Sequence, residues 1–377
     1  MKVLLISPVG ELGGGAESML YELVSVMKDK DEVEVLFMQE GELKNAIQAL
    51  GVQTFLLKNA KMRNIPRVIS WMFKYSKILR EIQPDVILSW MSKAHMFTAI
   101  PNYLAKIPTC WWQHGVPEPP NIFDKLSSKL PANKIGSSST IAMHAQKKLT
   151  NKPVFCSFPG SDIAKHVPNS KNRSILREQL GISDDTILLG NVGRIQSWKK
   201  QDQLIEVLDI LVKQEKKVKL LLVGGNLYNL DNDFENKIVQ MIKEKGLEDY
   251  VTTTGNQLDV SPYYDAMDIY VHAATGELFG IVMVEAMLHA KPLIVAKSPG
   301  SVEIVENGVT GTIVDDGSSK TIASEIERMI TNGNMELLGE NGRSRAIRLF
   351  SNKQMGSRII KELEGMNKNI EHNKVVV

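Results

Sequence analysis

The sequence predicts an α/β protein of two domains, each a parallel β-sheet with helices on both faces. The chain has 377 residues, more than one ordinary hydrophobic core organises. Short apolar runs alternate with amphipathic stretches, as in β-α-β units. This rhythm weakens around residues 159–173, where prolines, a glycine and polar residues cluster, and then resumes.

The first half contains six apolar runs of strand length. Clear helical patterns lie between them at Ser18–Met27 and Pro66–Ile82. The expected strands are Lys2–Ser7, Glu34–Phe37, Gln53–Leu57, Asp85–Trp90, Thr109–Gln113 and Lys134–Ser138. We therefore expect a first Rossmann-like domain over residues 1–165.

The second half repeats the pattern and predicts a second Rossmann-like domain over residues 166–350. The expected strands are Thr186–Val192, Lys219–Val223, Tyr250–Thr254, Ile269–His272, Leu293–Ala296 and Gly311–Val314. The expected helices are Gln203–Val212, Phe234–Lys245, Ile281–Ala290 and Ile322–Ile330. A ligand of two such domains is expected at the carboxyl ends of the strands, in a cleft where the halves face each other.

Composition excludes several classes of protein. Hydrophobic residues make up 43% and charged residues 23%, and the net charge is +2, so we expect a globular chain with no nucleic-acid partner. Cys110 and Cys156 lie in apolar surroundings and read as buried thiols in a reducing compartment. The first apolar run stops at Pro8 and no run has membrane-spanning length, so we expect a cytoplasmic protein with at most peripheral membrane contact.

A glycine loop follows the first strand and opens a helix. Glycines allow a close approach of backbone N–H groups to an anion, and the helix N-terminus favours negative charge. Gly13 and Gly15 begin a dinucleotide fingerprint, but its third glycine is missing. Taken alone, the loop is equally compatible with ligand contact and with a plain turn.

A basic segment, residues 193–200, lies between a strand and a helix of the second half. Arg194 and Lys199 would stand at the carboxyl end of the strand. A guanidinium and an ammonium there can bind a diphosphate and neutralise a departing nucleotide. The alternative is a solvated surface loop.

Two glutamates, Glu277 and Glu285, flank the start of an apolar helix. From Leu278 to Ala290 the only ionisable residues are Glu285 and His289, so Glu285 is a carboxylate on an inner helix and needs polar partners. Sugar hydroxyls would satisfy it, and so would a salt bridge to a distant cation. The amides at the helix start form a second anion site beside Glu277.

Together these segments resemble the retaining glycosyltransferases of family 4, which have the GT-B fold. The resemblance extends over nearly the whole chain. Its most specific motif is E-x7-E, met by Glu277 and Glu285, and "VGRIQSWKKQDQLI" resembles the family's phosphate-binding stretch. "GGAE" at Gly14–Glu17 resembles its N-terminal loop, and His114 in "QHG" matches its first-domain histidine.

The resemblance implies a role for each matched residue. Arg194 and Lys199 bind the diphosphate, Glu285 binds the ribose hydroxyls, and Glu277 contacts the transferred sugar. The amides of Phe279, Gly280 and Ile281 face sugar or phosphate oxygens. Gly14 and Gly15 approach the donor phosphate, and His114 contacts the sugar near the acceptor. The family usually has glycine after the phosphate lysine, whereas here Lys200 follows, so either lysine is a candidate for the main contact.

The resemblance also implies a reaction. We expect a metal-independent, retaining transfer of a hexose, glucose first, from a UDP-sugar to a polysaccharide or lipid-linked glycan, with no cofactor. The nearest approach to a metal-binding Asp-x-Asp pair is residues 231–233, which reads as a loop. The helix over residues 351–377 should pack back on the first domain, as in similar GT-B proteins.

Other functions remain compatible with the sequence. A sugar-nucleotide epimerase or a phosphorylase would share the fold, and a non-catalytic nucleotide-sugar binding protein would keep the same residues. A nicotinamide dehydrogenase is disfavoured by the broken glycine fingerprint.

Residues 58–80 are basic and contain no acidic residue. Their apolar and aromatic residues interleave with the cations, as in helices that rest on anionic lipid. An ordinary surface helix with a core-facing stripe has the same pattern. The cations are Lys58, Lys61, Arg63, Arg67, Lys74, Lys77 and Arg80.

Overall fold

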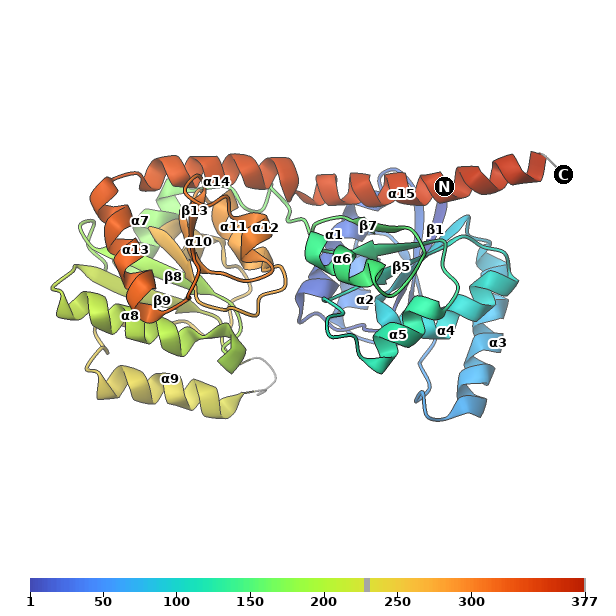
Figure 1. Ribbon diagram of the computed structural model, residues 1–377, viewed down its shortest axis with the longest axis horizontal. Coiled ribbons are helices and arrows are strands. Elements are labelled where there is room, and N and C mark those ends of the chain that lie inside the picture. Colours follow the sequence, from blue (N-terminus) through green and yellow to red (C-terminus); the bar gives the residue numbers. More distant parts are fainter. Residues whose placement is uncertain (227–230, 376–377) are drawn as a thin grey trace. The chain divides into compact units, whose positions relative to one another are not determined.

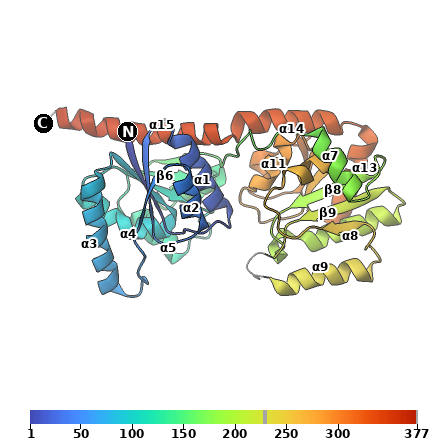
Figure 2. The ribbon, with the colours of Figure 1, turned by 180° about the vertical axis from the view of Figure 1, so that it is seen from behind.

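The computed structural model describes residues 1–226 and 231–375, with side chains up to residue 367 (Figures 1 and 2). These residues form two compact units. The first is Met1–Gly160 with Asn352–Val377, and the second is Ser161–Ser351. The last two residues of the helix expected over 351–377 lie outside the described part.

The units divide five residues earlier than the boundary expected at residue 165. The Ser161 N–H donates to the Phe350 carbonyl over 2.9 Å, and Ser161 forms a parallel bridge with Ser351. These contacts join the start of the linker to the end of the second unit.

The first unit is a seven-stranded, wholly parallel sheet in the order β3-β2-β1-β4-β5-β6-β7. The six strands expected from the sequence are present, and a seventh, β7, is only three residues long. The strands are β1 (Lys2–Ser7), β2 (Glu32–Phe37), β3 (Gln53–Leu56), β4 (Val86–Trp90), β5 (Thr109–Gln113), β6 (Lys134–Ser137) and β7 (Val154–Cys156).

Helices cover both faces of this sheet. They are α1 (Gly15–Met27), α2 (Glu42–Ala49), α3 (Ile65–Ile82), α4 (Met91–Leu104), α5 (Ile122–Lys129), α6 (Thr140–Lys147) and α15 (Asn352–Val375). Val3 and Leu5 of β1 pack with α1 and α15, whereas Leu4 and Ile6 pack with α3 and α4. Because strand side chains alternate between faces, a strand buried on both sides is a continuous apolar run.

The C-terminal helix α15 belongs to the first unit and lies against α1. A Cβ atom on Gly356 would stand 2.7 Å from Val26 Cγ1, so the two helices need glycine to approach this closely. Lys134 Nζ binds Glu362 Oε2 at 2.6 Å and ties α15 to β6.

The second unit is a six-stranded parallel sheet in the order β10-β9-β8-β11-β12-β13. Its strands are β8 (Ile187–Val192), β9 (Val218–Val223), β10 (Val251–Thr253), β11 (Ile269–His272), β12 (Leu293–Ala296) and β13 (Gly311–Val314). Its helices are α7 (Ser170–Gln179), α8 (Gln201–Lys213), α9 (Asn232–Glu244), α10 (Ser261–Ala266), α11 (Ile281–Leu288), α12 (Ser301–Ile304), α13 (Ser319–Asn332) and α14 (Met335–Leu349), with a short 3₁₀ turn at Ser197–Lys199.

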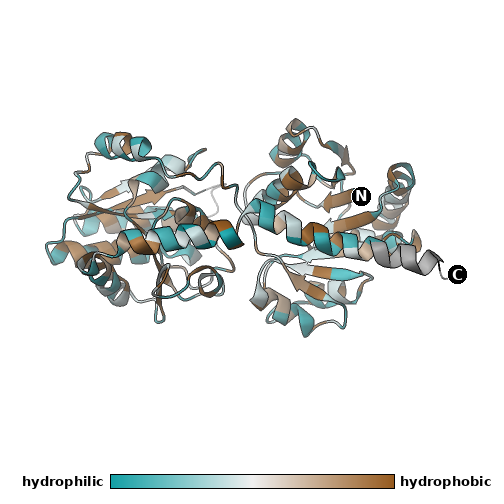
Figure 3. Cartoon of the chain, turned by 90° about the horizontal axis from the view of Figure 1, so that it is seen from above, coloured by the Kyte–Doolittle hydropathy of each residue, from teal (hydrophilic) through white to brown (hydrophobic). Residues whose placement is uncertain are grey.

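The strands of both sheets are largely hydrophobic, and hydrophilic residues gather on the helices around them (Figure 3). Each sheet reverses its strand order beside its first strand, β1 in one unit and β8 in the other. The carboxyl ends of strands next to such a reversal are where ligands of open α/β sheets bind.

Candidate functional site

The site of the second unit is built on the carboxyl ends of β8 and β11, which are neighbours in the sheet. The two strands pair in parallel, and Asn191 Nδ2 donates to the Val271 carbonyl over 2.8 Å. The loop after β8 carries Arg194 and Lys199, and the loop after β11 carries Glu277. Sequence positions some 80 residues apart therefore meet at one sheet edge.

Lys199 and Glu277 form an ion pair at this edge. Lys199 Nζ donates to Glu277 Oε2, and both side chains are largely covered by protein. The ammonium also lies over the Trp198 ring, 4.2 Å from its centroid, a cation–π contact. The exposed Lys200 forms no such pair within the described residues, so Lys199 is the lysine that points into the site.

Glu277 is held as a carboxylate although it is buried. Burial by itself raises the pKa of Glu277, but His272 and the Lys199 ammonium outweigh it and bring the pKa to about 2. His272 Nε2 lies 3.3 Å from Glu277 Oε2, and burial lowers the pKa of His272. Both contacts use Oε2, and Oε1 has no partner among the described residues, so Oε1 can accept from a ligand hydroxyl.

Gly280 makes the tight turn that starts α11. Its φ is +85°, and a Cβ there would lie 2.5 Å from Met283 Cε and 2.8 Å from Glu277 Cγ. Glycine is therefore required on both conformational and steric grounds. The first amides of a helix have no intrahelical acceptor, so the Ile281 N–H is available at this end of α11.

The loop around Phe279 is fixed from two sides. The Phe279 ring packs edge-to-face on Phe350, with centroids 5.8 Å apart. The Gly300 N–H donates to the Glu277 carbonyl over 2.8 Å, and a Cβ on Gly300 would lie 2.1 Å from the Phe279 carbonyl oxygen. The loop between β12 and α12 is thus in direct backbone contact with the loop that carries Glu277.

Glu285 lies one helical turn further along α11 and is partly buried. Its Oε2 accepts a hydrogen bond from the Tyr264 hydroxyl at 2.9 Å. A polar partner for this carboxylate was expected from the sequence, but the tyrosine was not.

Arg194 lies in the loop after β8. The path of this loop depends on Gly193, which follows β8, and on Gly224, which follows β9. A Cβ on Gly224 would stand 2.2 Å from the Gly193 carbonyl oxygen, so the two loops touch through backbone alone. The Arg194 carbonyl accepts from Gln201 Nε2 at 2.9 Å, whereas its guanidinium has no partner among the described residues.

The first unit carries the remaining three candidates, Gly14, Gly15 and His114. Gly14 is the N-cap of α1 in extended conformation, and a Cβ on it would clash with the Glu17 carboxylate. Gly15 has no positive φ, and a Cβ on it would meet nothing within 4 Å. Nothing in the described part of the chain requires glycine at 15.

His114 follows β5 and is linked to the glycine loop by Trp90, the last residue of β4. Trp90 Nε1 donates to the Ala16 carbonyl at 3.1 Å, and its ring lies edge-on to His114, with centroids 4.6 Å apart. Burial lowers the pKa of His114 to about 3, so the imidazole is neutral at physiological pH. Its Nε2 is covered and unpaired within the described residues.

The structure therefore assembles Arg194, Lys199, Glu277, the start of α11 and Glu285 within the second unit, and Gly14, Gly15 and His114 within the first. Sequence reasoning missed Trp90, His272 and Tyr264. The first two end strands β4 and β11, where site residues were expected. Tyr264 carried no signal, because its partner is distant in the sequence.

The described residues contain no group of three or more His, Cys, Asp or Glu side chains placed to hold an ion. Residues 231–233 are not the loop expected from the sequence. Asn232 begins α9, and Asp231 Oδ2 accepts from the Ser197 N–H at 2.8 Å, which fixes the turn before Lys199.

Two family models match the chain in consecutive parts. Residues 13–158 match glycosyltransferase family 4, and residues 172–345 match glycosyl transferases group 1. Among curated relatives, the capsular polysaccharide biosynthesis glycosyltransferase CapM of Staphylococcus aureus is 32% identical over 198 residues, 48% of this chain and 49% of CapM. The D-inositol 3-phosphate glycosyltransferase of Thermobifida fusca is 29% identical over 186 residues, 46% of this chain and 41% of that protein. The chain spans about half the length of the curated relatives it matches.

Solved structures match over nearly the full length. The Anabaena HepE structure in complex with UDP has a TM-score of 0.87 and 26% identity, covering 97% of this chain and 100% of that one. HepE with UDP and glucose has a TM-score of 0.83 with the same identity, covering 97% of this chain and 99% of that one. The lipopolysaccharide glycosyltransferase WaaG, 18% identical with a TM-score of 0.69, covers 96% of this chain and 100% of its own.

Proposed function

Because this chain belongs to glycosyltransferase family 4 and has the GT-B fold, we propose that it transfers a hexose from a UDP-sugar to a glycan acceptor with retention of configuration. The observation that carries the proposal is the arrangement in the second unit. A guanidinium, an ammonium and the start of a helix collect at one sheet edge, beside two carboxylates. Cations and amides suit a diphosphate, and carboxylates suit sugar hydroxyls.

Each residue receives a role on this proposal. Arg194, Lys199 and the start of α11 bind the diphosphate and stabilise it as it leaves. Glu277 binds the transferred hexose through Oε1, the oxygen that Lys199 and His272 do not use. Glu285 binds the ribose, Gly14 and Gly15 let the donor approach α1, and neutral His114 contacts the sugar.

Glucose is the proposed hexose. The support is that HepE, which matches the chain over its whole length, has been solved with UDP and glucose. The acceptor is proposed to be a polysaccharide or a lipid-linked glycan, in keeping with the capsular polysaccharide role of CapM.

The proposed mechanism is front-face attack without a metal or cofactor. The bond between the anomeric carbon and the diphosphate oxygen breaks, its electron pair stays on the diphosphate, and the acceptor oxygen bonds the same face of the sugar. The acceptor proton passes to the diphosphate. Glu277 is disfavoured as a covalent nucleophile because its Oε2 is committed to Lys199 and its pKa is held at about 2, which makes it a weak base.

The mechanism is tested with UDP-glucose and methanol as a surrogate acceptor. We expect methyl α-glucoside by NMR, with UDP release unchanged by EDTA. Methyl β-glucoside, or loss of UDP release with EDTA, would contradict the proposal. A glycosylated unmodified enzyme in the intact mass spectrum after mixing with UDP-glucose, absent from Glu277→Gln, would show a covalent route through Glu277.

The same measurement separates the alternatives. A sugar-nucleotide epimerase converts UDP-glucose with no acceptor present and forms no methyl glucoside. A non-catalytic binding protein binds UDP-glucose and leaves it intact.

We further propose that the protein works in the cytoplasm, in contact with an anionic membrane surface through residues 58–80. None of the helices in the described part of the chain is long and apolar enough to cross a bilayer. The support for surface contact is the outer face of α3, which lies at one edge of the first unit (Figure 1).

The exposed face of α3 is apolar as well as basic. Its core-facing stripe is Trp71, Tyr75, Leu79 and Ile82. Ile65, Ile69 and Phe73, spaced four residues apart, form a second stripe that points outward, and Phe73 is 69% exposed. An ordinary surface helix has only the first stripe.

The end of α4 extends this apolar face. Leu104 is 74% exposed and lines one groove together with Phe73 and Arg80. The seven cations of residues 58–80 are all exposed and have no acidic partner among the described residues. Apolar side chains flanked by unpaired cations match the chemistry of an anionic lipid surface better than that of a polyanion, which needs only charge.

Vesicle flotation tests the surface. We expect the protein to float with phosphatidylglycerol-containing vesicles and not with phosphatidylcholine alone. A Lys74/Lys77/Arg80→Glu variant and a Phe73→Ser/Leu104→Ser variant should each bind at least about tenfold more weakly. Lys171→Glu/Lys243→Glu/Lys320→Glu, which reverses three exposed lysines of the second unit, is the matched control. Unchanged flotation of the first two variants would refute the assignment.

A further inference from the structure

Tyr264 of α10 lies against Glu285 of α11, and the pair is part of a hydrogen-bond network in the second unit. The Tyr264 hydroxyl is 2.9 Å from Glu285 Oε2 and 3.1 Å from the Val282 carbonyl. A hydroxyl has one proton, and a carboxylate is the stronger acceptor, so the hydrogen bond goes to Glu285. The Tyr264 ring is fully buried.

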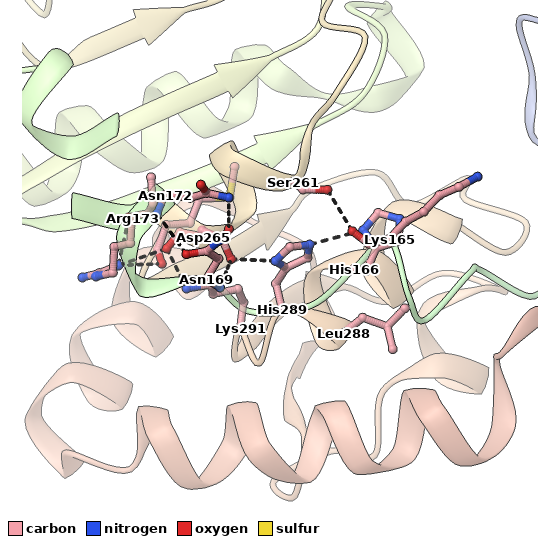
Figure 4. A network of polar contacts seen from close by, with 12 residues as sticks. Lys165, His166, Asn169, Asn172, Arg173, Ser261, Asp265, Leu288, His289 and Lys291 are labelled. Atoms are coloured by element: carbon pink, nitrogen blue, oxygen red, sulfur yellow. Dashed lines mark hydrogen bonds and ion pairs between the residues drawn. The ribbon is translucent and has the colours of Figure 1, made fainter. Parts of the chain in front are cut away.

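The second connection between α10 and α11 is made by the next residue, Asp265. Its Oδ1 receives a hydrogen bond from His289 Nδ1 at 2.8 Å (Figure 4). His289 lies four residues after Glu285 in the sequence. The His289 ring also stacks on the Tyr264 ring, with centroids 5.3 Å apart and planes 22° from parallel. Two adjacent residues of α10 thus bind Glu285 on α11 and His289, the residue that caps the end of α11.

Asp265 itself is fixed by the segment at the start of α7. It accepts from the Asn169 N–H at 3.1 Å and from Asn172 Nδ2 at 3.2 Å, and Lys291 Nζ donates to its carbonyl at 3.0 Å. His166 Nδ1 lies 3.3 Å from His289 Nε2 (Figure 4). In the tautomer in which His289 Nδ1–H donates to Asp265, His289 Nε2 can accept from His166 Nδ1–H, so one assignment satisfies both contacts. The support behind Tyr264 is therefore rigid.

From this hydrogen-bond network we infer that Tyr264 is a positioning residue for Glu285, and that it sets the orientation in which the carboxylate meets the ribose of the donor. The inference rests on the proposed role of Glu285 in ribose binding. A carboxylate that accepts a hydrogen bond from a buried, well-supported hydroxyl has its orientation restricted before the ligand arrives. A ligand that meets a pre-oriented group avoids the cost of ordering it.

The test is UDP binding by calorimetry to the full chain and to Tyr264→Phe, which keeps the ring, its stacking and its volume. We expect about tenfold weaker UDP binding. Binding of 2′,3′-dideoxy-UDP, which lacks the ribose hydroxyls, should be the same in both proteins. A merely structural role would weaken both ligands equally, and that result would overturn the inference.

A double-mutant comparison separates this inference from the proposed function. If Tyr264 acts through Glu285, the double variant Tyr264→Phe/Glu285→Ala should bind UDP with the same affinity as Glu285→Ala alone. A further loss in the double variant would contradict the inference. If Glu285→Ala alone left UDP affinity intact, the ribose role itself would be wrong. If Tyr264→Phe folds poorly, His289→Phe replaces it, because that variant disturbs the support of Tyr264. The ratio of UDP affinity to dideoxy-UDP affinity should then fall, and an unchanged ratio would overturn the inference.

Discussion

Replacing Glu277 by glutamine tests the electrostatics of the site. The pKa of Glu277 falls from its ordinary 4.5 to about 2, which corresponds to about 3 kcal/mol of folding free energy. A depressed carboxylate pKa stabilises the folded state above the unfolded pKa, and the contribution is lost as the pH falls through the folded pKa. The contribution should therefore be complete at neutral pH and disappear between pH 4.5 and pH 2.

Glutamine imitates the protonated carboxyl group, so Glu277→Gln should lower the stability of the second unit by about 3 kcal/mol at pH 7. The assay is hydrogen exchange by mass spectrometry on peptides from β8 and β11, at several pH values. The difference from the unmodified protein should shrink as the pH falls below 4.5. Glu340→Gln, at an exposed position of the same unit, should differ by less than about 0.5 kcal/mol at every pH. A Glu277→Gln difference that stays constant with pH would refute the reasoning.

Five further variants test the loops of the site. Lys199→Met should lower the rate of transfer by about a hundredfold and Lys200→Met by little, because only Lys199 enters the site. The rate is measured as UDP release at saturating donor, and equal losses of rate in the two variants would contradict this assignment. Lys200→Gly should raise the free energy of unfolding by up to about 1 kcal/mol in urea titrations, because Lys200 has a left-handed backbone with φ of +61°. Gly280→Ala should destabilise the fold by about 2 kcal/mol, whereas Gly15→Ala should fold normally and bind UDP-glucose more weakly. A loss of stability in Gly15→Ala would mean that the role of Gly15 is structural.

The two-sheet architecture could be predicted from the sequence because parallel strands buried on both faces are continuous apolar runs. All six strands expected in the second unit are present. β7 was not expected from the sequence, and its position is set by pairing with β6. The exact unit boundary could not be predicted, since it depends on the contacts of Ser161 with residues 350 and 351.

The cations and carboxylates of the site could be identified from their positions after strands. Their partners could not, because partners are set by the order of strands in the sheet. Lys199 meets Glu277 only because β8 lies beside β11, and Tyr264 meets Glu285 only because α10 lies against α11. The sequence also left the outward stripe of α3 undecided, since the pattern of residues does not say which of two apolar stripes faces the core.

The most direct test of the central claim is a thermal-shift screen of nucleotides and nucleotide sugars. A ligand at about a hundred times its dissociation constant adds roughly 2.7 kcal/mol of stability. We predict stabilisation by UDP and by UDP-glucose, lost in Arg194→Ala and in Glu285→Ala. Stabilisation by NAD alone, by no nucleotide, or by UDP equally in both variants would contradict the account.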